Sequence, residues 1–249
     1  MTGRSTMGLV KTEGLVLRET KYGEHDKMLT VFTKDWGSVS VSARGVRGGK
    51  RRCTGAGLFC YSKFVLFQGR GPYHLNECEL IHSFHRLGDD LTRMSAAAYF
   101  CETAEREQME NLPLLRLLLN SLSLLDRGDR PVWQIKGVYE LTAAAAFGFA
   151  PVLSSCVRCG KQTALNRFSC QEGGVLCDSC GAGRKRVSGA VFHAMAFVQQ
   201  STNPFAFQLA EEYREEFSSL CQKFFLYYLG KRPKSLDFLE ELLSFEKNA

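Results

Sequence analysis

Two pairs of cysteines constrain this chain more than any other feature. Each pair has the spacing C-x2-C, seventeen residues separate the pairs, and a glycine follows each one. A two-residue spacer lets one tight turn direct both sulfurs at the same ion, and two such turns complete the tetrahedral four-sulfur shell that structural zinc prefers. A shell of four protein ligands leaves no open position for catalysis. We therefore predict a structural Zn²⁺ held by Cys156, Cys159, Cys177 and Cys180.

The remaining cysteines leave other arrangements open. Cys170 lies seven residues before Cys177 and could compete as a ligand, although the symmetry of the two pairs favours the four named above. Cys78 with His82 and His85 could form a second cluster, but no fourth partner is evident. A redox dithiol needs only one cysteine pair, and that pair lies between a strand and a helix. Neither pair of this chain has that position in the sequence pattern. Ten cysteines in 249 residues do not suit a small secreted disulfide framework, so a reducing compartment is expected.

The first third of the chain has the pattern of β-structure. Five alternating, β-branched or aromatic runs are separated by turn signals, and they cover residues 14–18, 27–33, 36–43, 61–67 and 73–81. Five short strands in about 75 residues is the count of an oligonucleotide-binding (OB) barrel. An SH3-like barrel or a fragment of a sandwich has a similar pattern.

Helical periodicity dominates after residue 82. The predicted helices cover residues 89–108, 112–125, 132–147, 188–200, 207–229 and 236–245, with Asp90 placed to cap the first of them. We therefore predict an α+β protein with a five-stranded OB-type barrel (residues 1–80) and a helical bundle (residues 81–249), the bundle being interrupted by a small zinc-binding insert (residues 154–187). No apolar stretch is long enough to span a bilayer and no secretory signal is evident, which favours a soluble cytoplasmic protein.

Positive charge is concentrated in the barrel. Residues 1–80 hold 13 basic and 7 acidic residues, whereas residues 81–249 hold 19 of each, so the net charge of +6 arises in the first third. This asymmetry is typical of a module that binds a polyanion. A glycine-rich loop between the third and fourth strands can follow a phosphate backbone without reading bases, although it could simply be solvated. The candidate DNA-binding residues are Arg44, Arg47, Lys50, Arg51 and Arg52 in this loop, together with Lys11, Arg18 and Lys34.

A smaller basic cluster follows the second cysteine pair. Arg184, Lys185 and Arg186 could contact either DNA or an acidic tail of a partner.

Several catalytic patterns are missing from the sequence. No phosphate-binding loop is present, and GxGxxG after a strand, HExxH and GxSxG do not occur. We therefore expect no nucleotide site and no enzymatic activity.

The order of these features along the whole chain resembles the RecO family of bacterial DNA repair and recombination mediators. The resemblance is carried by residues 14–37, by the basic loop at residues 43–52, and by the cysteine-containing residues 156–160 and 173–180. It implies binding of single- and double-stranded DNA, annealing of complementary strands, and loading of RecA, together with RecR, onto DNA coated by single-strand-binding protein. It also implies that the helical domain binds the acidic C-terminal tail of that protein. The location that the resemblance implies is the nucleoid in the cytoplasm. The family often lacks the cysteines, so the zinc prediction rests on this sequence itself.

Two other functions remain open at the level of sequence. One is a zinc-containing protein-interaction scaffold that does not bind DNA, and the other is a nucleic-acid-modifying enzyme that uses zinc as a scaffold. Charge reversal at Arg47, Lys50, Arg51 and Arg52 separates the first from a DNA-binding protein.

Overall fold

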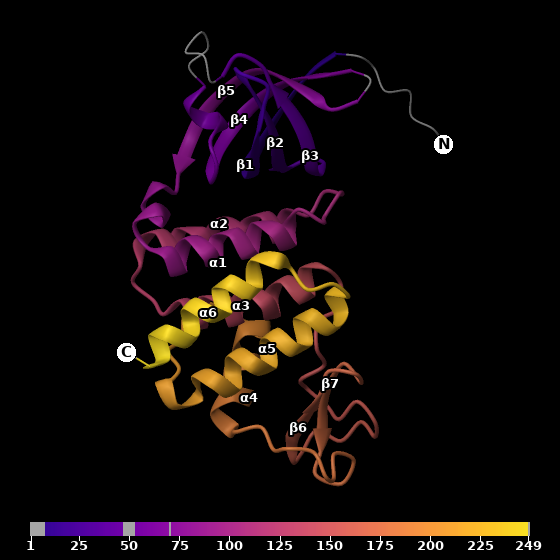
Figure 1. Cartoon of the computed structure of the whole chain (residues 1–249). Coiled ribbons are helices and arrows are strands. Elements are labelled where there is room, and N and C mark those ends of the chain that lie inside the picture. Colours follow the sequence, from indigo (N-terminus) through magenta and orange to yellow (C-terminus); the bar gives the residue numbers. More distant parts are fainter. Residues whose placement is uncertain (1–7, 47–52, 70, 249) are drawn as a thin grey trace, which may run out of the picture. The chain divides into compact units, whose positions relative to one another are not determined.

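The computed structural model describes residues 8–46, 53–69 and 71–248, and it has the predicted α+β architecture (Figure 1). The chain divides into two compact units, Met1–Asp126 and Arg127–Ala249. The first unit contains the barrel with helices α1 and α2, and the second contains the remaining helices and the cysteine-rich insert. The domain boundary expected near residue 80 stays a prediction.

Five strands form a closed barrel in the order β1-β2-β3-β5-β4. Their bounds are β1 Gly8–Tyr22, β2 Asp26–Thr33, β3 Gly37–Ala43, β4 Cys60–Gln68 and β5 Tyr73–Ser83. Strand β1 pairs with both β2 and β4, and a parallel pairing of Val41 with Tyr73 joins β3 to β5. This closed ring confirms the predicted barrel in place of a sandwich fragment.

Strand β1 is longer than its sequence pattern indicates. Its first half pairs with β4, from Gly8 opposite Gln68, and its second half pairs with β2 as far as Tyr22 opposite Asp26. The register with β2 shifts between Val16 and Arg18, just after the pairing with β4 ends at Leu15. Partners on both sides, which local periodicity does not reveal, account for the extra length.

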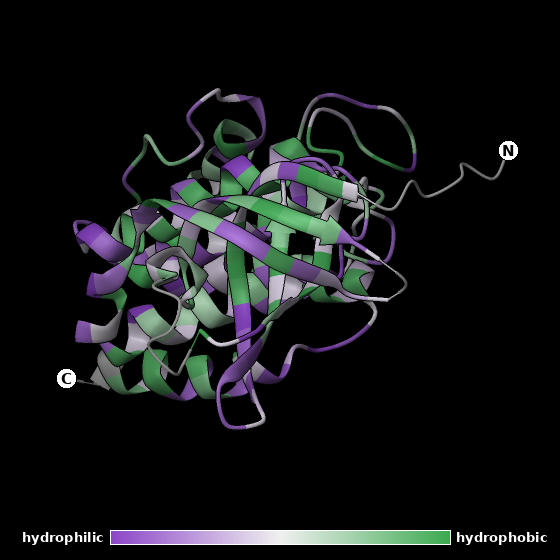
Figure 2. Cartoon of the chain, turned by 90° about the horizontal axis from the view of Figure 1, so that it is seen from above, coloured by the Kyte–Doolittle hydropathy of each residue, from purple (hydrophilic) through white to green (hydrophobic). Residues whose placement is uncertain are grey.

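The barrel interior is filled by residues that alternate with polar ones along the strands. The buried core contains Val16, Leu29, Val31, Val41, Ala43, Ala56, Phe64, Leu66 and Leu75. In Figure 2 the strands carry both hydrophobic (green) and hydrophilic (purple) residues, which agrees with this alternation. Burial of one face of every strand fixes the register, because a slip of one residue would expose the whole apolar set.

Two helices complete the first unit, namely α1 (Leu91–Ala104) and α2 (Leu112–Arg127). The Asp90 side chain accepts a hydrogen bond from the Arg93 backbone at 2.9 Å, which confirms the predicted cap. The segment after α1 contacts the barrel, since the backbone N–H of Ser38 donates to the Glu107 carbonyl at 2.7 Å. The segment that follows α1 is thereby tied to the start of β3.

The second unit contains four helices and a two-stranded sheet. The helices are α3 (Val132–Ala146), α4 (Gly189–Gln200), α5 (Arg214–Leu229) and α6 (Lys234–Asn248), and the strands of the insert are β6 (Leu165–Ser169) and β7 (Gly174–Cys177). Helix α5 begins at Arg214 and not at residue 207. The Phe207 carbonyl instead accepts side-chain hydrogen bonds from Arg130 and Gln134, which hold this segment against α3. In the part of the chain that the structure describes, no helix is long and apolar enough to cross a membrane.

A buried ion pair lies inside helix α3. Lys136 and Glu140 are 1% and 0% exposed, and their nitrogen and oxygen atoms are 2.8 Å apart. Lys136 also donates to the Gln222 side chain of α5 at 2.6 Å. The pair is therefore closely packed within the second unit.

We expect Lys136→Met to lower the free energy of unfolding by about 3–5 kcal/mol, because it leaves the Glu140 carboxylate buried without its ammonium partner. The double variant Lys136→Met/Glu140→Leu removes both charges, so it should recover most of this loss. Urea denaturation of both variants measures the difference. Equal stability of the single and double variants would contradict the prediction.

Candidate metal centre and nucleic-acid interface

The four predicted ligands converge in the second unit. The sulfur atoms of Cys156, Cys159, Cys177 and Cys180 all lie within 4.8 Å of one another. The Cys159 and Cys177 sulfurs are 3.7 Å apart. A tetrahedral shell with metal–sulfur bonds of about 2.3 Å places neighbouring sulfurs about 3.8 Å apart. The group therefore has the dimensions of a four-cysteine metal site, as the spacing in the sequence predicts.

The two knuckles have matching backbone hydrogen bonds. The N–H of Gly160 donates to the Cys156 carbonyl, and the N–H of Gly181 donates to the Cys177 carbonyl, both at 2.8 Å. The two glycines serve different purposes. Gly160 has a φ of +75°, which favours glycine, whereas a Cβ on Gly181 would lie 2.6 Å from the Arg167 side chain. One glycine thus permits the turn and the other permits close packing.

The local electrostatics favour a bound cation. Burial raises the pKa of the Cys156 thiol, but backbone hydrogen bonds from Cys177, Arg158 and Cys159 outweigh this effect and bring its pKa to about 6. Hydrogen bonds with the Cys159 and Cys177 side chains, with burial, raise the pKa of Cys180 to about 12. Four thiols this close cannot all ionise unless a cation balances them. A divalent ion at their centre supplies that charge.

The alternative ligands do not join this group. Among the residues that the structure describes, these four cysteines are the one set of His, Cys, Asp or Glu side chains close enough together to hold an ion. Cys170 lies outside the set, as do Cys78, His82 and His85. Burial raises the pKa of the Cys170 thiol, which the nearby Lys223 ammonium partly offsets.

Two carboxylates organise the arginines of the insert. Glu172 pairs with Arg158 and Arg184, the Arg184 contact being 3.1 Å. Asp178 pairs with Arg167 at 3.4 Å and Arg186 at 3.1 Å. Of the predicted basic cluster, Arg184 and Arg186 are thus engaged within the insert, and Lys185 between them is exposed. The sequence does not reveal these pairs, because the partners lie 8 to 14 residues apart and no repeating spacing relates them.

The structure brings some of the predicted DNA-binding residues together and separates others. Lys11 and Lys34 line one groove of about 510 Å³ on the barrel, together with Lys63. Arg18 instead pairs with Glu105 at 2.6 Å. Arg44 is exposed directly after β3. Arg47, Lys50, Arg51 and Arg52 lie outside the described residues.

The groove itself is not cationic. Alongside its three lysines it contains the four carboxylates of Glu13, Asp35, Glu77 and Glu79. Lys63 lies 3.7 Å from Glu79, and the Asp35 carboxylate accepts a hydrogen bond from Thr12 at 2.6 Å. The groove therefore offers little net attraction to phosphate.

The excess of positive charge in the first 80 residues comes from a small set of basic residues. The described residues among them carry seven basic and seven acidic side chains. The six remaining basic residues, which equal the net charge of the whole chain, are Arg4, Arg47, Lys50, Arg51, Arg52 and Arg70. The excess charge thus belongs to segments outside the described residues, and four of the six lie in the predicted loop.

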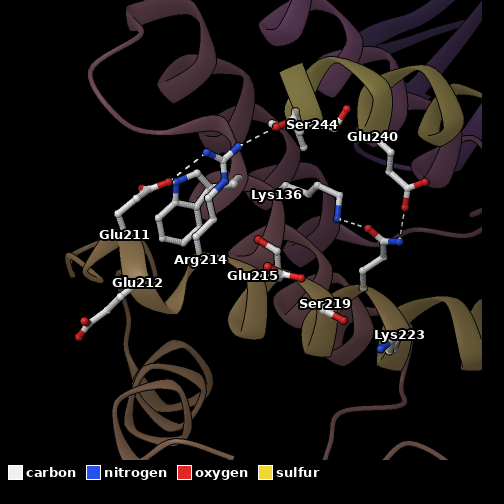
Figure 3. Close-up of a pocket in the computed structure, with 13 residues that line it drawn as sticks. Lys136, Glu211, Glu212, Arg214, Glu215, Ser219, Lys223, Glu240 and Ser244 are labelled. Carbon is white, nitrogen blue, oxygen red and sulfur yellow. Dashed lines mark hydrogen bonds and ion pairs between the residues drawn. The ribbon is translucent and has the colours of Figure 1, made fainter. Parts of the chain in front are cut away.

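A second pocket, of about 820 Å³, lies among the helices of the second unit (Figure 3). Its polar groups bond to one another: Lys136 donates to Gln222, and Gln222 donates to Glu240, both at 2.6 Å. Trp133 donates to Glu211 at 3.2 Å on the opposite wall. Four glutamates outnumber the three basic residues that line the pocket, so it does not resemble an anion site.

A closed OB-type barrel followed by helices and a four-cysteine cluster defines an α+β class of protein, and comparisons with known proteins specify the family. The model for the N terminal region of Recombination protein O matches residues 7–84, and the model for its C terminal region matches residues 88–237. The chain belongs to the RecO family of DNA repair and recombination proteins.

Two curated relatives are similar over nearly the whole chain, and a third is similar over about two thirds of it. DNA repair protein RecO of Acetivibrio thermocellus is 35% identical over 246 residues, which are 95% of this chain and 98% of the relative. The protein of the same name from Symbiobacterium thermophilum is 32% identical over 252 residues, covering 96% and 99% of the two chains. That from Alkaliphilus metalliredigens is 42% identical over 178 residues, covering 69% and 72%.

Proposed function

We propose that this chain is a non-enzymatic recombination mediator. It binds single- and double-stranded DNA, anneals complementary strands and, with RecR, helps to load RecA onto DNA coated by single-strand-binding protein. It acts in the cytoplasm at the nucleoid. The observation that carries the proposal is the concentration of charge: five cations fall within residues 44–52, on a barrel whose described surface is electrically balanced. Membership of a DNA repair family supports DNA as the polyanion.

Annealing requires no nucleotide in this mechanism. Two complementary strands pair spontaneously once their phosphates approach, and phosphate repulsion is the obstacle that a protein can lower. A glycine-rich basic loop can contact either backbone without reading bases. The barrel then serves to hold the loop, and no side chain has to accept or donate a proton.

We propose Zn²⁺ as the ion at the four-cysteine site. Four sulfur ligands in a tetrahedral arrangement are the usual shell of structural zinc, and the closed shell leaves no position for substrate. When bound, the ion supplies the positive charge that lets all four thiols ionise. Cys156 and Cys159 hold it from one knuckle, and Cys177 and Cys180 hold it from the other.

The helical unit is the proposed site for the acidic tail of single-strand-binding protein. Lys185 is the best placed of the three predicted contacts there, because Arg184 and Arg186 are already paired with acids of the insert. We therefore expect Arg184 and Arg186 to contribute less to binding of the acidic tail than Lys185 does.

Annealing of two complementary labelled oligonucleotides, without nucleotide, tests the mediator function. Wild type is expected to accelerate annealing, and reversal of Arg47, Lys50, Arg51 and Arg52 to glutamate is expected to abolish the acceleration, because the loop would then repel phosphate. Unchanged melting temperature of the variant controls for folding. Absence of acceleration by folded wild type at low salt would overturn the proposal and favour a protein-interaction scaffold.

A further inference from the structure

A row of aromatic rings lies at the C-terminal end of α5. Phe147 and Phe149, which follow α3, stack with their centroids 6.0 Å apart and their planes 8° apart. Phe149 in turn stacks on Tyr228, with centroids 5.4 Å apart and an angle of 18°. Tyr227 meets Tyr228 edge to face at 5.1 Å. Three nearly parallel rings and a fourth at their side thus form one continuous cluster, which we call the aromatic row.

The outer rings of the row are open to solvent, although those behind them are buried. Tyr227 and Tyr228 are 53% and 37% exposed. The neighbouring Phe224 and Phe225 of the same helix are 1% and 0% exposed, and Phe225 also contacts Phe147 and Phe149. The exposed rings are therefore held on a rigid base, so that a ligand would lose little additional conformational entropy by ordering them.

Basic side chains flank the row. Lys223 and Lys231 lie four residues before and after Tyr227, which places Lys223 one helical turn away on the same side of α5. Lys223 also lines a cleft of about 1130 Å³, of which Arg184, Lys185 and Arg186 form another part. The carboxylates of that cleft come from the opposite end of α5, where Glu215 and Glu216 lie in its first turn and Glu212 lies just before it. Along the helix, the charge thus changes from acidic to basic as it approaches the aromatic row.

We propose that the aromatic row is a second binding site for single-stranded DNA, in which bases stack on Tyr227 and Tyr228 while Lys223 and Lys231 contact the adjoining phosphates. Stacking on flat rings beside cations is how proteins bind single strands without sequence preference. A duplex hides the faces of its bases, so this site selects single strands, which the basic loop does not. The inference rests on the proposed function, because it assumes that DNA is the ligand.

The test is a double variant, Tyr227→Leu/Tyr228→Leu, which removes both rings but keeps an apolar side chain at each position and keeps both lysines. Its affinity for a labelled oligothymidine is expected to fall about tenfold, whereas its affinity for duplex of the same length changes less than twofold. The salt dependence of binding should stay unchanged because no cation is lost. Tyr227→Phe/Tyr228→Phe should bind as wild type does, and Phe245→Leu, on a 70% exposed residue of α6, is the matched control.

Photo-crosslinking of wild type to an oligonucleotide containing 5-bromouracil gives an independent readout that needs no variant to fold. Crosslinked peptides are expected to contain Tyr227 or Tyr228. If wild type binds single strands but the leucine variant binds them equally well, or if no crosslink maps to this row, the inference is wrong and the proposed function stands. Loss of binding to an acidic peptide with DNA affinity intact would assign the row to a protein partner. Failure of wild type to bind DNA at all would overturn both this inference and the proposed function.

Discussion

Replacement of Cys177 by serine is expected to release the metal and to unfold the insert. Cys177 is 3% exposed at the end of β7, and its sulfur lies 3.7 Å from that of Cys159. The small core of the insert consists of Cys156, Leu176 and Cys177, with Val157, Leu165 and Cys180 packed against it. Three of these six residues are predicted metal ligands, so little apolar packing would remain without an ion.

We therefore expect metal binding to be coupled to folding of this segment. Structural zinc contributes about 10–16 kcal/mol of apparent binding free energy in small zinc domains, and a segment shorter than about 40 residues rarely folds without such support. We expect Cys177→Ser to lose the ion and to lower the unfolding temperature. Amide hydrogen exchange should lose its protection across residues 154–187 and retain it in the barrel. Elemental analysis and hydrogen exchange measure the two effects.

Cys170→Ser is the matched control for this prediction. Cys170 lies in the same insert but outside the four-sulfur group. The control should keep one ion per chain and the wild-type melting temperature. If the Cys177→Ser protein has lost its metal but has the same melting temperature as wild type, the ion does not support the fold.

Features that depend on neighbours in the sequence could be predicted from it. Short fixed spacings predict the four-cysteine group and the cap at Asp90. A local run of alternating, β-branched or aromatic residues predicts each strand of the barrel. The two cysteines of each knuckle and the cap with its helix are close along the chain, the two knuckles are matched by their identical C-x2-C spacing, and the strands repeat with a fixed period.

Features that depend on distant partners could not be predicted. Arg18 resembles a free cation in the sequence, but it pairs with Glu105, 87 residues away. Tyr227 and Tyr228 belong to an apolar run that favours a buried helix face, yet Phe224 and Phe225 occupy the core and leave the tyrosines exposed. Competition between aromatic residues for one interior is settled by packing, which a local pattern does not contain.

The location of charge has a consequence for the affinity of the barrel for DNA. Lys11 and Lys34 are surrounded by carboxylates, and Arg18 is paired, so these three candidates contribute little net field. The described surface of the barrel has no excess charge to attract a polyanion. The loop should therefore account for nearly all of the electrostatic binding by this unit.

Neutralising the loop to glutamine at Arg44, Arg47, Lys50, Arg51 and Arg52 is expected to weaken binding to single-stranded DNA by about 100-fold at low salt. Each phosphate contact contributes about −0.7 to the slope of log affinity against log salt concentration. The wild-type slope should be about −3 to −5, and in the variant it should fall to about −1.4, which is what the two phosphate contacts of Lys223 and Lys231 in the aromatic row contribute. Fluorescence anisotropy across a salt series measures both quantities.

The groove lysines provide the comparison that locates the interface. Lys11→Gln/Lys34→Gln/Lys63→Gln removes three charges from the same barrel, against five in the loop variant, but from a site where four carboxylates already balance them. Its slope should change by less than about 0.5, because these side chains make no phosphate contact that would release counterions from DNA. A groove variant that loses as much slope as the loop variant would place DNA on the strands. The barrel surface would then bind nucleic acid through individual lysines in spite of its balanced charge, and the loop would be a secondary contact.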